Sequence, residues 1–158
     1  MRSRSQADSA RSQRGIETVE MAIILPLLLF LLVAVAEFGR MINQYDTLSK
    51  AVRDGARYAA STSSLGSTGL VYLTPAIQTS VANLVATGTV NGTGSPLLPG
   101  LTPADVTVSA TGPGPTYVQV SVRYTYEPMV GATLPTFGVT NPISLDVPLT
   151  ATSVMRAL

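Results

Sequence analysis

The feature that most constrains this chain is an apolar segment that runs from Met21 to Ala36 without a charged residue. Eleven of its sixteen residues are Ile, Leu, Val or Phe, and each such residue favours helix insertion into a bilayer by about 0.3–0.6 kcal/mol. From Glu20 to Glu37 a helix would rise about 25 Å, close to the roughly 30 Å hydrocarbon core of a membrane. The sequence therefore predicts one membrane-spanning helix over about residues 20–38, in which Pro26 is tolerated.

The charge distribution predicts the orientation of this span. Residues 1–15 hold four arginines and one aspartate, a net charge of +3, which leaves −2 for the rest of a chain whose total is +1. Positive charge before the span favours a cytoplasmic N-terminus and an extracytoplasmic remainder. Because the basic excess is confined to a short tail, which we expect to be disordered, we predict no nucleic-acid partner.

The chain has neither cysteine nor histidine. The missing cysteine removes disulfides, thiol chemistry and thiolate metal sites. The missing histidine removes the commonest general base and transition-metal ligand. The nine acidic residues show no paired spacing typical of a catalytic site, so we predict no enzyme and no cofactor or metal.

The helical pattern continues beyond the predicted span. Apolar residues recur at steps of three and four, which is typical of an amphipathic helix. We therefore predict one unbroken helix over residues 16–60, in which Gly39 and Gly55 each weaken helicity by about 1 kcal/mol relative to alanine. The residues of the predicted apolar face are Phe38, Met41, Ile42, Tyr45, Leu48, Val52, Ala56 and Ala59.

The remaining residues, 61–158, are predicted to form an extracytoplasmic α+β domain. After a flexible link over 61–69, Thr74-Pro75 matches the start of a helix and Gly88 its end, with Ile77, Val81, Leu84 and Val85 on the apolar face. The period then changes from helix to strand. Three alternating runs, at 106–110, 118–126 and 143–151, predict an antiparallel sheet covered by the long helix, and Pro148 favours an edge strand or strand end.

The segment RGIETVEMAIILPLLLFLLVAVAEFGRMINQY, followed by AVRDGARYAA, resembles the TadE-like proteins, the pseudopilins or minor pilins of tight-adherence (Tad/Flp, type IVc) pilus systems. The resemblance covers about residues 14–60 and rests on five features in order. They are the leader glycine, the glutamate five residues after it, the proline-interrupted apolar run, Glu-Phe-Gly-Arg, and Arg-Asp-Gly-Ala-Arg.

The resemblance implies a pilin-like architecture and a structural role in pilus assembly, adhesion or secretion. Residues 1–15 would be a prepilin leader that a membrane prepilin peptidase removes by cutting between Gly15 and Ile16. The mature chain would stay in the bacterial cytoplasmic membrane and join copies of itself or other pilin subunits. This sequence departs from the family pattern at two positions. Met21 stands where the family often has Tyr or Phe, and Glu17 is an additional acid.

Glu20 would be the fifth residue of that mature chain. A carboxylate near the new Ile16 amine and the helix N-terminus is favourable, but an ionised acid in lipid costs about 2.5 kcal/mol or more unless it is paired. We predict that Glu20 pairs with the Ile16 amine of a neighbouring subunit and sets the stagger between subunits. Pairing within one chain is the weaker alternative, and Glu17 could take that role.

Further along the helix, four charged residues are candidate contacts. Glu37 and Arg40 are three residues apart and either pair at the outer membrane face or remain solvated. Asp54 and Arg57 either lie on a solvated face, together with Lys50 and Arg53, or contact another subunit.

Two other interpretations of the N-terminal segment remain. Ala34-Val35-Ala36 matches a signal-peptidase site, and a cut after Ala36 would release an extracytoplasmic binding domain that begins at Glu37. An uncleaved signal anchor would keep residues 1–15. The cut after Ala36 is disfavoured because the helical spacing of apolar residues continues across Ala36 without interruption.

Overall fold

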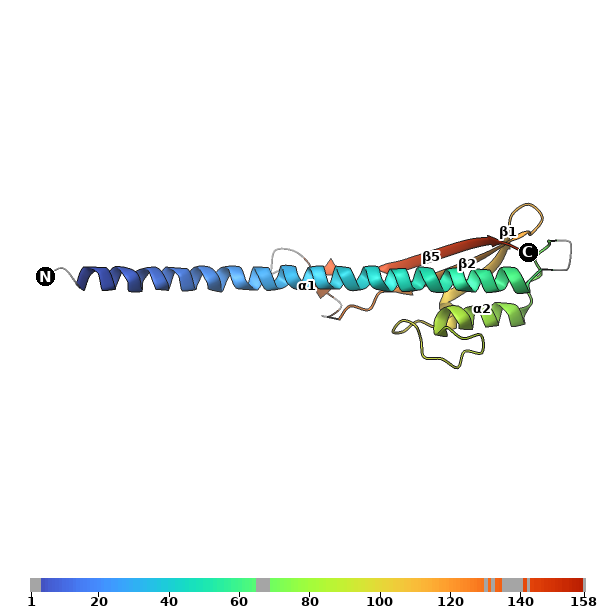
Figure 1. Ribbon diagram of the computed structural model, residues 1–158, viewed down its shortest axis with the longest axis horizontal. Helices are drawn as coiled ribbons and strands as arrows, with labels where there is room; N and C mark the ends of the chain where they lie inside the picture. Colours follow the sequence, from blue (N-terminus) through green and yellow to red (C-terminus); the bar gives the residue numbers. More distant parts are fainter. Residues whose placement is uncertain are drawn as a thin grey trace. The chain divides into compact units, whose positions relative to one another are not determined.

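The computed structural model describes residues 4–64, 69–129, 131, 133–134, 141 and 143–157, and within these ranges the side chains from Glu17 onward, apart from 134 and 143. The chain divides into two compact units, Met1–Gly39 and Arg40–Leu158. The elements in chain order (Figure 1) are α1 (Arg4–Thr62), α2 (Pro75–Thr87), the 3-10 turn η2 (Pro103–Asp105), β1 (Val106–Thr111), β2 (Tyr117–Thr125), β3 (Thr133–Leu134), β4 (Ile143–Ser144) and β5 (Pro148–Arg156).

Helix α1 is longer than the sequence predicts. It begins at Arg4 rather than Ile16 and ends at Thr62 rather than Ala60, and it continues through Pro26. The expectation of a disordered leader is therefore wrong from Arg4 onward, while Met1–Ser3 lie outside the described residues. The physical reason is that Arg, Ser, Gln and Ala are acceptable helix formers, and one glycine inside a long helix costs only about 1 kcal/mol.

The Arg40–Leu158 unit is built on a three-stranded antiparallel sheet with the strand order β1-β2-β5. Val108 pairs with Val120 in the first ladder, and Val122 pairs with Ala151 in the second. Strand β2 is central, and its alternate residues Val118, Val120, Val122 and Tyr124 are buried, as the period of two predicts. The α+β fold class with a long helix, one short helix and three antiparallel strands is confirmed.

The third predicted run, residues 143–151, is not one strand. Ile143–Ser144 forms β4, which pairs with β3 in a separate two-stranded sheet, and β5 begins only at Pro148. Proline has no N–H for a ladder, and here it is the first residue of an edge strand, as predicted. Strand β5 also continues past Ala151 to Arg156, where the alternation of apolar and polar residues is weak.

Helix α2 has the predicted ends. The Thr74 hydroxyl oxygen accepts a hydrogen bond from the Ile77 N–H at 3.3 Å, and Pro75 is the first helical residue. Gly88 ends the helix in the left-handed conformation, where its N–H donates to the Leu84 carbonyl. The buried face is Val81, Ala82, Val85 and Ala86, so Leu84 is only half-buried, contrary to the prediction.

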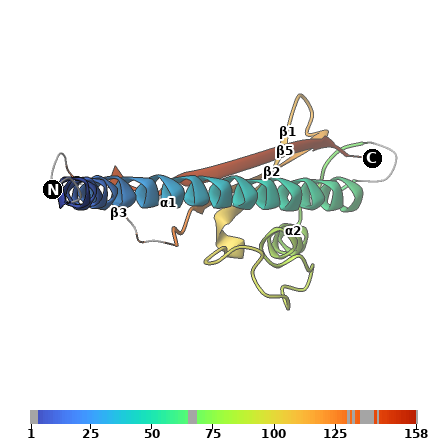
Figure 2. The same ribbon diagram turned by 60° about the vertical axis from the view of Figure 1, so that its left-hand side comes forward.

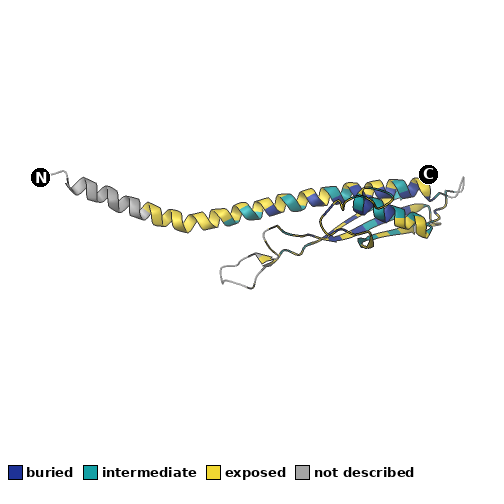
Figure 3. Cartoon of the chain, turned by 90° about the horizontal axis from the view of Figure 1, so that it is seen from below, coloured by how far each residue is buried: buried dark blue, intermediate teal, exposed yellow. Residues whose placement is uncertain are grey.

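The core of this unit brings the C-terminal part of α1 together with α2 and the sheet. Among the described side chains of α1, Figure 3 shows the buried ones in the C-terminal half of the helix. Phe38, Ile42 and Tyr45, predicted on the apolar face, are instead 65%, 59% and 47% exposed. At 100° per residue, Phe38 lies on the same side of α1 as the buried Ala56, and Ile42 on the same side as the buried Ala60. The position along the helix, and not the helix face, therefore separates the exposed residues from the buried ones. The core residues that α1 contributes are Leu48, Ala51, Val52, Ala56 and Ala59.

Candidate membrane and assembly site

The apolar segment of α1 is exposed to solvent in the isolated chain. Most of its large side chains are exposed, by between 39% at Ile24 and 71% at Ile23, while Phe30 and Val33 are half-buried. Within the described part of the chain, α1 is the one helix that is long and apolar enough to cross a membrane, and none of its most apolar 18-residue window is buried. Leaving such a surface in water is unfavourable by roughly 25 cal/mol per Å². This segment therefore fits a membrane anchor.

The predicted processing and pairing residues lie at the start of this segment. Gly15 and Ile16 lie within α1, but their side-chain surroundings are outside the described residues. Glu17 and Glu20 are both exposed. Because both carboxylates are accessible on the isolated chain, either is available to a group from another molecule.

Glu37 and Arg40, which the sequence left as either an ion pair or two solvated charges, are not both exposed to solvent. Glu37 is buried, with 6% of its surface exposed. In the Arg40–Leu158 unit, Arg40 is half-buried, and its Nη1 atom is buried without a hydrogen-bond partner among the described residues. Four residues on, Gln44 is 7% exposed and its Oε1 atom also lacks such a partner. This polar stretch sits where α1 leaves the predicted span.

The Arg-Asp-Gly-Ala-Arg element spans residues 53–57 of α1, and its residues divide between two faces. Arg53, Asp54 and Arg57 are exposed, whereas Gly55 and Ala56 are buried. A Cβ atom on Gly55 would lie 2.5 Å from Val85 Cγ2 of α2 and 3.8 Å from Val120 Cγ1 of β2. The glycine thus permits the close approach of α1 to α2 and the sheet, while the charges face solvent. One turn earlier, Lys50 forms an exposed ion pair with Asp46 at 2.6 Å.

Asp54 and Arg57 border a shallow groove of about 470 Å³ between α1 and the α2 region. Tyr58 and Ser61 continue its α1 wall, and Leu84 and Val90 form the opposite wall. The structure thus brings these two predicted contact residues to one opening, although their exposure matches the solvated alternative equally well.

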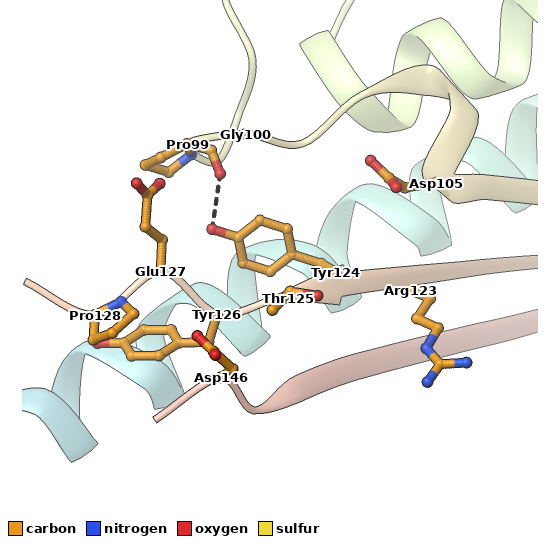
Figure 4. Close-up of a pocket in the computed structure, with 10 residues that line it drawn as sticks. All are labelled: Pro99, Gly100, Asp105, Arg123, Tyr124, Thr125, Tyr126, Glu127, Pro128 and Asp146. Carbon is orange, nitrogen blue, oxygen red and sulfur yellow. Dashed lines mark hydrogen bonds between the residues drawn. The ribbon is translucent and has the colours of Figure 1, made fainter. Parts of the chain in front are cut away.

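A second cavity, of about 490 Å³, lies where β2 ends and β5 begins. Figure 4 shows the Tyr124 hydroxyl pointing at the loop before η2, where it donates to the Pro99 carbonyl at 2.9 Å. Burial raises the pKa of Tyr124, the Glu127 carboxylate adds to the rise, and the Arg40 charge opposes it. Tyr126 is buried beside it, so both tyrosines belong to the core, as the sequence favours.

The two aspartates that line this cavity accept hydrogen bonds from neighbouring residues. Asp105 accepts hydrogen bonds from the Thr102 N–H and hydroxyl, and Asp146 accepts one from the Ser144 hydroxyl. Among the described residues, no group of three acidic, histidine or cysteine side chains could hold a metal ion.

Sequence reasoning missed two features of α1. One is the steric requirement for Gly55, which the small residues Ala51, Gly55, Ala56 and Ala59 at helical spacing could have indicated. The other is the buried polar stretch at Glu37 and Gln44. Polar residues on a helix are assigned to solvent by default, so no local signal identified it.

Comparison with known proteins matches one part of the chain. The family model of the TadE-like proteins matches residues 15–57, which hold the leader glycine, the apolar segment and the Arg-Asp-Gly-Ala-Arg element. No curated protein and no solved structure matches the chain. This N-terminal segment, which holds the exposed apolar helix and the glycine-centred contact, is thus similar to the TadE-like proteins.

Proposed function

We propose that this chain is a minor pilin or pseudopilin of a Tad (Flp, type IVc) pilus, a structural and not an enzymatic component. The single observation that carries the proposal is the TadE-like match over residues 15–57. The exposed apolar segment of α1 supports membrane anchoring. In this proposal the N-terminus is cytoplasmic, and the domain over residues 61–158 is extracytoplasmic or carried into the pilus.

A prepilin peptidase cuts the proposed precursor between Gly15 and Ile16. Cleavage requires an extended backbone in the protease site, whereas Gly15 lies inside helix α1 of the uncut chain. Glycine reduces the free energy of unwinding the helix there by about 1 kcal/mol relative to alanine. Arg11 and Arg14 hold the leader at the anionic cytoplasmic surface.

After cleavage the Ile16 amine and the first turn of the helix are both positively charged regions. Glu20 is one turn away and exposed, so it is accessible to the corresponding amine of a neighbouring subunit. Pairing removes the penalty of an unpaired carboxylate near lipid. The pair then fixes the axial stagger between subunits, whereas Glu17 is not required for it.

The first test is the N-terminal sequence of the native chain in the membrane fraction. We expect it to begin at Ile16, and Gly15→Trp to leave the full leader in place. A membrane chain that keeps Met1, or a soluble chain that begins at Glu37, would contradict the proposal.

The second test separates cleavage from assembly. Glu20→Ala should be cut normally yet be depleted at least about tenfold from the sheared pilus fraction, the effect expected for losing about 1.4 kcal/mol. Glu17→Ala is the matched control, since it removes another exposed carboxylate three residues away. Normal incorporation of Glu20→Ala, or equal depletion of both variants, would refute the role in stagger.

A further inference from the structure

Strand β5 presents a free backbone edge on the side away from β2. In the order β1-β2-β5 it is an outer strand, and it extends over nine residues. It is the long red strand in Figure 2. The described residues make no backbone hydrogen bond to its outer side. Between Pro148 and Arg156 it carries no charge, so it lacks the charged side chains that usually keep edge strands from pairing.

Two hydrogen bonds identify which backbone groups point outward. Next to each end of β5, the Tyr126 N–H donates to the Val147 carbonyl at 3.0 Å and the Ala157 N–H donates to the Thr116 carbonyl at 2.9 Å. Directions alternate along a strand, so odd-numbered residues of β5 face β2. The N–H groups of the even-numbered residues Thr150, Thr152, Val154 and Arg156 therefore face away from it.

The other edge of the same sheet has matching groups. The ladder places Thr107 opposite Ser121, and the alternation in β2 assigns odd-numbered residues of β1 to that ladder. Val106, Val108 and Ala110 thus face outward, although the Val106 N–H is taken by the Pro103 carbonyl. The described residues make no backbone hydrogen bond to the outward groups of Val108 and Ala110, and no residue of β1 is fully buried.

The two edges are complementary in direction and in register. Both β1 and β5 are antiparallel to β2, so they run parallel to each other. Through Ser121, Thr107 is level with Thr152 in the sheet. In a parallel ladder an outward-facing residue must be level with an inward-facing one, and these two residues satisfy that condition.

We propose that β5 pairs with β1 of a second copy of this chain to form a continuous sheet. With no shift along the strands, the Thr152 N–H meets the Val106 carbonyl of the second copy, and the Val108 N–H of that copy meets the Thr152 carbonyl. About five such bonds form over the six-residue overlap. Each copy gives one edge and accepts the other, so the contact does not close and continues from copy to copy.

Charge and direction favour β1 as the occupant. Strand β1 has no charged side chain. Two β5 strands side by side in parallel at the same level would put outward-facing residues opposite each other, which a parallel ladder does not allow. An antiparallel β5 pair would point the two copies in opposite directions. That step rests on the proposed function, because it takes both copies to be anchored in one membrane.

Cysteine cross-linking between full-length copies tests the pairing, and the chain has no native cysteine. Thr107→Cys and Thr152→Cys would be expressed on separately tagged copies in one cell, and membranes would be oxidised mildly. Neighbouring strands are about 4.8 Å apart, within disulfide range. The same residues in one chain are separated by β2 and lie about 9.6 Å apart, beyond the roughly 7 Å limit.

We expect a mixed dimer only on co-expression, at least tenfold above the control pair of Asn91→Cys with Thr152→Cys. Dimers of Thr152→Cys alone would indicate β5–β5 pairing and overturn the proposal. So would the absence of the mixed dimer from membranes whose chains begin at Ile16 and enter pili, an outcome that leaves the proposed function intact. A soluble chain that begins at Glu37 would instead refute the proposed function.

A second variant tests the hydrogen bonds themselves. Val154→Pro removes an outward N–H without removing a bond of the β2–β5 ladder, and proline is tolerated at such edge positions. It should lower the mixed-dimer yield at least tenfold while the thermal midpoint changes little. Val154→Thr keeps the N–H and should cross-link normally. Undiminished cross-linking of Val154→Pro would contradict edge pairing, and the two-cysteine result stands independently if this variant misfolds.

Discussion

At the scale of single residues, Gly55 determines how closely α1 approaches α2. The 2.5 Å separation between a Cβ atom at this position and Val85 Cγ2 is shorter than any tolerable contact. Valine is stiff at χ1, and Val85 is fully buried, so it has little room to move. The clash of an added Cβ atom with Val85 therefore outweighs the gain in helix propensity that replacing glycine would bring.

We expect Gly55→Ala to lower the free energy of unfolding by about 1–2 kcal/mol, the usual range for overpacking. Gly39→Ala is the control, because nothing lies within 4 Å of its Cβ position; there alanine should stabilise the helix by up to about 1 kcal/mol. Thermal unfolding in detergent measures both. The cost of Gly55→Ala should shrink in a Val85→Ala background, and an unchanged cost would contradict the steric explanation.

Ionisation of Tyr124 makes the stability of the fold depend on pH. Its pKa is raised above 10.0 by burial, with a smaller contribution from Glu127, so the folded state favours the neutral phenol. Stability from this group is complete below pH 10 and is lost as the pH rises through the higher folded pKa. Tyr124→Phe should cost about 1 kcal/mol near pH 7 for the lost bond to Pro99. The difference in thermal midpoint between the unsubstituted chain and Tyr124→Phe should narrow above pH 10. A difference that stays constant as the pH rises would show that ionisation of Tyr124 does not affect stability.

At the scale of elements, the short helix α2 follows from local sequence. Thr74 caps it, Pro75 begins it and Gly88 ends it, and each residue acts within one turn of its own position. Strand β2 is similar, because its alternation over nine residues is strict. Such elements could be predicted from the sequence because their signals are local.

The N-cap of α2 gives a direct test at this scale. Thr74→Ala removes the acceptor of the Ile77 N–H and should lower the free energy of unfolding by about 1 kcal/mol. Thr79→Ala is the matched control: its hydroxyl donates to the Pro75 carbonyl on an exposed face, so its removal should change stability by less than about 0.5 kcal/mol. Chemical denaturation followed by circular dichroism compares them, and equal effects would argue against capping.

Other elements could not be predicted because their limits depend on distant partners. Residues 143–151 alternate throughout, yet Ile143 pairs with Leu134 and Leu149 pairs with Tyr124 in two different sheets. The alternation does not identify a partner strand, so it cannot mark where one sheet ends and another begins. The exposed Phe38, Ile42 and Tyr45 were misassigned for a similar reason, since periodicity defines a face but not what covers it.

At the scale of the whole molecule, the chain is two units with opposite surfaces. The Met1–Gly39 unit exposes apolar side chains, whereas the Arg40–Leu158 unit has its own core. Every residue of that core lies between Leu48 and Ala157. The two units therefore need different surroundings, lipid or other subunits for the first and water for the second.

This division predicts that a chain which begins at Arg40 folds by itself. It keeps every core residue, so its thermal midpoint should lie within about 5 °C of that of the full chain, a shift of about 1 kcal/mol for a domain of this size. Circular dichroism and calorimetry measure this. A non-cooperative transition, or a midpoint lowered by more than about 10 °C, would show that the first unit contributes to the fold.

By itself the sequence determined the membrane-spanning length of the apolar segment, the TadE-like N-terminal pattern, the α+β class and the ends of α2. These depend on composition and on neighbours within a few residues, where physical preferences act locally. Only the tertiary structure decided the need for glycine at 55, the burial of Gln44, and the free edge of β5. Each of these depends on which distant segment lies against the residue or strand, and a one-dimensional pattern does not contain that information.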